Sequence, residues 1–235
     1  MSAPSTRPCA SSAPPPPTSE PQPWSFVSYL SQRFPPWPFF PLAGLLAAPG
    51  ILSDARAGAL GVESGSRIGV ALVLLLALRL ADDLADREWD LAQPRRRSTV
   101  MASEPSRAWR ALQALALTAL AGLALLPGGG VRIVGALALC AVLGGWYRWR
   151  PPPGSGSRFL NAVVVLGKYP AIVALLWPAL GRGPGVGALA LSYGGALGYE
   201  LAHDPSTRPR GSGWSAFALG AALGLAAAGL VWSVA

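Results

Sequence analysis

Ten residues, Ala81–Asp90, hold five of the eleven acidic side chains in this 235-residue chain. On a helix, Asp82, Asp86 and Asp90 lie four residues apart and share one face, and Asp83 flanks that face. Stacked carboxylates repel one another and destabilise a bare helix. Because Mg²⁺ and Ca²⁺ bind hard oxygen ligands, the spacing predicts a divalent-cation site. The alternative is a solvated polar helix end that nearby arginines neutralise.

A second acidic pair, Glu200 and Asp204, also has a spacing of four residues and ends another apolar segment. We expect both acidic clusters to lie at the same side of a membrane, where they can converge on one cation site. The predicted metal ligands are Asp82, Asp83, Asp86, Asp90, Glu200 and Asp204.

The basic residues supply the positive charges and hydrogen-bond donors that a diphosphate needs in addition to a metal ion. Lys168 is the chain's only lysine and lies within an apolar segment, where an ionisable group is costly and usually functional. The alternatives are a lysine that extends to the interface or one that pairs structurally with an acid. Arg79, Arg96 and Arg150 are further candidates for binding phosphate oxygens. For Arg150, a topology signal is an equally good explanation.

Tyr147 can present its ring face to a carbocation, although packing or an interfacial aromatic belt explains such a residue as well.

The composition indicates a membrane protein, since 51% of the residues are hydrophobic and only 13% are charged. The net charge of +8 comes from arginine, without the basic and aromatic interleaving of a nucleic-acid-binding protein. The two cysteines, Cys9 and Cys140, predict neither a disulfide framework nor a metal site.

The elements that must position these residues are apolar helices. Residues 1–23 are rich in proline and serine and predict a disordered tail, and residues 24–235 predict one transmembrane helical domain. Seven segments approach the roughly 20 residues that cross a bilayer core. The fold class is therefore all-α, a polytopic membrane bundle of about seven transmembrane helices around a central cavity. The segments are 37–53, 62–81, 108–127, 131–147, 159–181, 185–201 and 212–234.

The arginines predict the orientation of this bundle, because cytoplasmic loops carry more positive charge. They place the N-terminus and both acidic clusters in the cytoplasm and the C-terminus outside, in an integral protein of a bacterial inner (plasma) membrane. Few arginines are assigned to the outer side: Arg56, Arg67, Arg132 and Arg182.

These motifs resemble those of the UbiA superfamily of intramembrane prenyltransferases, over roughly residues 24–211. The family's first motif, N/D-D-x-x-D-x-x-x-D, is matched by all four carboxylates from Asp82 to Asp90, and its second, D-x-x-x-D, has Glu200 in the first position. Three further matches are looser. Pro94–Arg97 resembles the family's P-x-R-P sequence, and Tyr147 with Arg150 resembles its tyrosine and basic residue in the loop after span four. Tyr29–Pro36 resembles the segment that leads into span one. Family members usually have nine spans, two more than are expected here.

The resemblance implies a Mg²⁺-dependent enzyme that ionises an isoprenyl diphosphate and transfers the prenyl group to a small aromatic or lipid-like acceptor. Asp83, Asp86, Lys168 and Tyr147 would act in catalysis. Arg79, Arg96, Arg150 and Lys168 would bind the diphosphate, and the six carboxylates would hold the metal.

Two other functions stay open. A membrane terpene cyclase of the same superfamily would ionise farnesyl or geranylgeranyl diphosphate and quench the cation within its own chain. A non-catalytic membrane protein would bind lipid diphosphates without turnover. The sequence does not specify the donor length, the acceptor or the oligomeric state.

Overall fold

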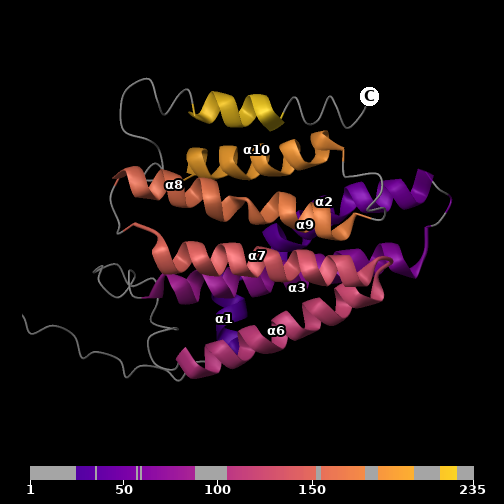
Figure 1. Ribbon diagram of the computed structural model, residues 1–235, viewed down its shortest axis with the longest axis horizontal. Helices are drawn as coiled ribbons and strands as arrows, with labels where there is room; N and C mark the ends of the chain where they lie inside the picture. The colour runs from indigo at the N-terminus through magenta and orange to yellow at the C-terminus, as the bar shows by residue number, and fades with distance from the viewer. Residues whose placement is uncertain are drawn as a thin grey trace, which may run out of the picture.

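The computed structural model describes residues 25–34, 36–56, 58, 60–87, 105–151, 155–177, 185–203 and 218–226. All regular structure in these ranges is helical, which confirms the all-α class (Figure 1). The helices are α1 (Phe26–Arg33), α2 (Pro36–Arg56), α3 (Val62–Ala85), α6 (Pro105–Leu125), α7 (Gly129–Trp149), α8 (Ser155–Leu166), α9 (Lys168–Leu176) and α10 (Val186–His203). Residues 218–226 form a further helical stretch.

Four helical segments in the described ranges are long and apolar enough to cross a membrane. They are Pro36–Ala55, Pro105–Leu125, Gly129–Trp149 and Arg158–Leu176. These segments fit an integral membrane protein, as predicted. The number of seven spans is not confirmed: α3 and α10 are helices where expected but are not among the four, and of 212–234 only 218–226 is described.

The core lies where α3 and α9 meet their neighbours. α3 packs against α2 and α6, whereas α9 packs against α2, α7 and α10. In Figure 1 the long helices run along the horizontal axis of the view, with α6 oblique at the bottom and α10 near the top. Buried side chains such as Leu74, Leu123, Leu143 and Ile172 fill the space between them.

Two glycines shape this packing. Gly128, with a φ of 76°, adopts the left-handed conformation in the tight turn from α6 to α7, and a side chain there would be strained. Gly122 allows α6 to approach α3 closely, because a Cβ atom at this position would lie 2.6 Å from Cγ2 of Val70.

The segment predicted to span as 159–181 is not one continuous helix. It is divided at Gly167, so that α8 ends at Leu166 and α9 begins at Lys168. The break gives Lys168 the first position of a separate short helix in the interior of the protein.

Candidate functional site

The end of α3 carries a buried carboxylate, Asp82, that is held by two other helices. The Lys168 ammonium forms an ion pair with Asp82 Oδ2, and the Tyr147 hydroxyl donates a hydrogen bond to Oδ1. The side chains of Lys168 and Asp82 are only 7% and 12% exposed. The only lysine therefore does not extend to the interface but pairs with an acid inside the bundle.

Asp83, the next residue, is bound by a different set of side chains. The Tyr29 hydroxyl donates to Asp83 Oδ2 at 3.0 Å, and Arg33 Nη2 donates to Oδ1 at 3.2 Å. Arg79 Nη2 lies 3.5 Å from the same Oδ1. Burial, together with the Asp83 carboxylate, raises the pKa of Tyr29 above its ordinary value, so its hydroxyl keeps its proton and remains a donor.

Asp86 forms the third pair. Arg150 Nη1 lies 2.6 Å from Asp86 Oδ1, and Arg150 Nη2 donates to the carbonyl of Ala85 at 2.8 Å. The guanidinium carbon also lies 5.4 Å from the centroid of the Tyr147 ring. Arg150 thus caps the C-terminal end of α3 and does more than mark topology.

The prediction that Asp82, Asp86 and Asp90 share one helix face is confirmed for the first two residues. Asp82 and Asp86 both point towards the C-terminal end of α7, where their partners are Tyr147 and the cap residue Arg150, whereas Asp83 faces α1. Among the described residues, no group of three acidic, histidine or cysteine side chains is placed to hold a metal ion.

Several predicted site residues are not tested by this geometry. Glu200 lies near the end of α10 and is partly exposed, and its convergence with the α3 carboxylates stays a prediction. Asp90, Asp204 and Arg96 lie outside the described residues. The functional roles assigned to all these positions also stay predictions.

The described side chains include the donor types that a divalent cation and a diphosphate would need, but they are paired with one another and do not surround a metal position. Three carboxylates offer hard oxygen ligands, and four basic side chains (Arg33, Arg79, Arg150 and Lys168) offer donors for phosphate oxygens. Arg79 Nε is buried and has no hydrogen-bond partner among the described residues.

The sequence did not identify Tyr29 and Arg33 as direct partners of Asp83. Their spacing of four residues, which places a tyrosine and an arginine on one face of an amphipathic helix, was the available signal. What that face contacts could not be inferred, because Asp83 lies 50 residues or more along the chain.

Arg67 and Arg132 are buried, with 0% and 1% of each residue exposed. Their assignment to the outer side of the membrane stays a prediction. Arg67 donates to the carbonyl of Leu176, and Arg132 donates to the carbonyls of Leu175 and Trp177, so the two guanidinium groups satisfy the C-terminal end of α9. Arg67 also forms an ion pair with Asp54 at 3.1 Å.

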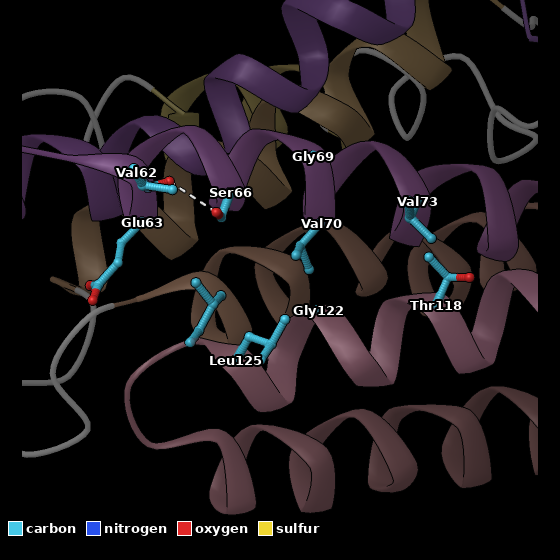
Figure 2. A pocket seen from close by; sticks show the side chains of 10 residues that line it. Val62, Glu63, Ser66, Gly69, Val70, Val73, Thr118, Gly122 and Leu125 are labelled. Atoms are coloured by element: carbon cyan, nitrogen blue, oxygen red, sulfur yellow. Dashed lines mark hydrogen bonds between the residues drawn. The ribbon is translucent and has the colours of Figure 1, made fainter.

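A groove of about 460 Å³ lies between α3 and α6, at the opposite end of α3 from Asp82, Asp83 and Asp86 (Figure 2). On α3 it is lined by Val62, Ser66, Gly69 and Val73, and on α6 by residues that include Thr118 and Gly122. The groove is mostly apolar and open on one side. It is a different space from the central cavity expected behind the carboxylates, which stays a prediction.

No protein-family model, curated protein or solved structure matches this chain. The resemblance to the UbiA superfamily therefore depends on the motif residues alone.

Proposed function

We propose that this protein is a Mg²⁺-dependent intramembrane prenyltransferase that transfers a prenyl group from an isoprenyl diphosphate to a small hydrophobic acceptor. One observation carries the proposal: α1, α3, α7 and α9 gather three carboxylates and four basic side chains at one end of an apolar helical bundle. Such charges are costly in a membrane protein, and their concentration supports a charged ligand with a hydrophobic tail.

The basic side chains would bind and neutralise the leaving diphosphate. Lys168 and Arg150 are nearly buried, with side chains 7% and 5% exposed, so their charges act in a medium that screens them poorly. Arg79 brings its unused Nε donor. When the C–O bond of the donor breaks, its electron pair leaves with the diphosphate, and these cations stabilise the developing negative charge.

The carboxylates of α3 would hold Mg²⁺, which supplies charge neutralisation to the diphosphate. Tyr147, which already contacts the Asp82 carboxylate and the Arg150 guanidinium, would present its ring to the positive charge that develops on the reacting carbon. The acceptor then forms the new bond to carbon and gives up a proton.

We also propose seven membrane spans, with the acidic end of α3 and the N-terminus on the cytoplasmic side. In this arrangement the water-soluble diphosphate product leaves directly into the cytoplasm. Cysteine labelling from either side of sealed vesicles tests the orientation.

The test is pyrophosphate release by purified protein in nanodiscs. Geranyl, farnesyl and geranylgeranyl diphosphate are the donors, and a panel of aromatic and lipid-like acceptors is supplied with Mg²⁺. We expect Asp83→Ala and Asp86→Ala to abolish release without preventing membrane insertion. Glu63→Gln is the matched control, because Glu63 is an exposed acid at the other end of the same helix.

Full release by both aspartate variants would refute the assignment. A cyclic product formed without an acceptor would instead identify a terpene cyclase.

A second function is favoured by the pairing itself. The three carboxylates Asp82, Asp83 and Asp86 are each already bound to a basic side chain, as in a protein that binds lipid diphosphates without turning them over. Calorimetric binding of every donor without pyrophosphate release would support this reading over the enzyme.

A further inference from the structure

The groove between α3 and α6 begins at the level where a candidate membrane span ends. Leu125 is the last residue of that span, and together with Val62 at the start of α3 it lines the groove. These two side chains are 86% and 88% exposed. Large apolar side chains that are exposed next to one another mark a surface for lipid or another apolar partner.

The groove has the length of one leaflet of a bilayer. Figure 2 shows Glu63 at one end of it and Val73 with Thr118 at the other. Ten residues of α3 separate Glu63 from Val73, a distance of about 15 Å along the helix. Since the hydrocarbon core of a bilayer is about 30 Å thick, the groove can follow one acyl chain through half of that core.

A glycine keeps the groove open on the α3 side. A Cβ atom at Gly69 would meet nothing within 4 Å, so the space beside this residue is empty. The neighbouring lining is apolar and includes Val70 of α3 and Leu126, which follows α6. The volume of about 460 Å³ is within the roughly 300–1,000 Å³ of pockets that bind small molecules.

The polar groups of the groove accept hydrogen bonds but have no proton to offer. Ser66 donates its hydroxyl to the carbonyl of Val62, and Thr118 donates to the carbonyl of Ala114, both at 2.9 Å. Among the described residues that line the groove, Glu63 is the one that carries a charge, and a carboxylate is an acceptor only. The complementary ligand is an apolar chain whose polar end carries positive charge and N–H donors.

We propose that this groove binds a membrane phospholipid with a primary ammonium head group, of the phosphatidylethanolamine class. The ammonium pairs with Glu63 through charge-assisted hydrogen bonds, and one acyl chain lies along Gly69 and Val73. A trimethylammonium head group has the same charge but no N–H donor, and it binds less tightly. The lipid occupies a surface at the other end of α3 from the candidate site, and no step of the proposed reaction is assigned to it.

The first test is native mass spectrometry of the full-length protein in detergent with added phospholipids. The lipids have identical acyl chains, and their head groups run from phosphatidylethanolamine through its N-methylated forms to phosphatidylcholine. We expect the unaltered protein to bind phosphatidylethanolamine about tenfold more tightly than phosphatidylcholine. Glu63→Gln should bind the two lipids equally, because its amide carries no charge to pair with the ammonium.

A second variant fills the groove itself. Gly69→Leu places a large side chain in the empty space and should weaken the binding of both lipids about tenfold. The matched control is Gly144→Leu on α7, where a Cβ atom also meets nothing within 4 Å and the lipid affinities should not change. Helical circular dichroism checks that each variant is folded.

The position of the lipid is tested by photo-crosslinking in nanodiscs. Phosphatidylethanolamine with a diazirine in one acyl chain is irradiated, and the labelled peptides are identified by mass spectrometry. We expect labels within residues 62–73 and 118–126, and fewer of them in Gly69→Leu.

The outcomes decide the lipid site separately from the enzyme, because none of these readouts uses pyrophosphate. Equal affinity for the two lipids in the unaltered protein overturns the proposal, and so does a preference that survives in Glu63→Gln. Labelling that falls only outside α3 and α6 also overturns it. A dimer that Gly69→Leu dissociates would show that a second copy of the chain, and not a lipid, occupies the groove.

Discussion

Variants of the Asp82–Lys168 ion pair can show whether the pair contributes to stability, to function or to both. Lys168→Met removes the ammonium and leaves a buried carboxylate, and Asp82→Leu leaves a buried ammonium. Both side chains are at most 12% exposed, so water compensates the remaining charge poorly.

The magnitude follows from this burial. Removing one partner of a buried pair costs about 3–5 kcal/mol, whereas replacing both partners by apolar residues is often close to neutral. We therefore expect the double variant Asp82→Leu/Lys168→Met to be more stable than either single variant. If the two effects were independent, the double variant would instead lose roughly 6–10 kcal/mol, the sum of two such costs.

The assay is reversible unfolding in mixed micelles, with SDS as the denaturant and helical circular dichroism as the signal. Asp82→Leu/Arg148→Gln is the control, because Arg148 is exposed and its effect should simply add to that of Asp82→Leu. A double variant whose loss equals the sum of the single losses would refute the coupling. The stable double variant should still fail to release pyrophosphate, because it lacks a metal ligand and a phosphate-binding group of the proposed site.

Three other predictions concern packing and the metal. Arg132→Met leaves the last carbonyls of α9 without their donors and should cost about 1–3 kcal/mol in the same unfolding assay, whereas Arg148→Gln should have little effect. Gly122→Ala should cost about 1–3 kcal/mol because its Cβ would overlap Val70, and Val70→Ala should recover most of that loss. Gly144→Ala, where a Cβ meets nothing within 4 Å, is the control and should be neutral or stabilising. Dialysis against EDTA should abolish pyrophosphate release, Mg²⁺ should restore it, and activity that survives chelation would contradict the metal proposal.

Helix positions could be predicted well because apolar segments are long and their boundaries are marked by proline and glycine. The segments at 108–127 and 131–147 agree closely with α6 and α7, and the turn at Gly128 separates them. The break at Gly167 has a signal in the sequence, because Pro170 lacks the N–H that would donate to the carbonyl of Leu166, and a bend near Lys168 is therefore expected. The apolar composition did not show that the segment divides into two helices.

The candidate site could be predicted only as a set of residue types. Spacing correctly placed Asp82 and Asp86 on a shared face, and the rarity of Lys168 singled it out. The partner of each carboxylate depends on how helices rotate against one another, which no local pattern encodes. For the same reason the burial of Arg67 and Arg132 could not be predicted, because each donates to carbonyls of a helix far along the chain.

The long separation between partners bears on how the protein is made. Arg67 awaits a carbonyl that is synthesised 109 residues later, and Asp82 awaits Lys168, 86 residues later. If α3 enters a bilayer in order of synthesis, it arrives before Lys168 can neutralise the Asp82 carboxylate. Its nascent segment must then remain near the insertion machinery or in the headgroup region until α9 emerges. Ribosome-bound chains that stop before residue 168 should therefore leave α3 extractable by alkali, and chains that extend past α9 should not.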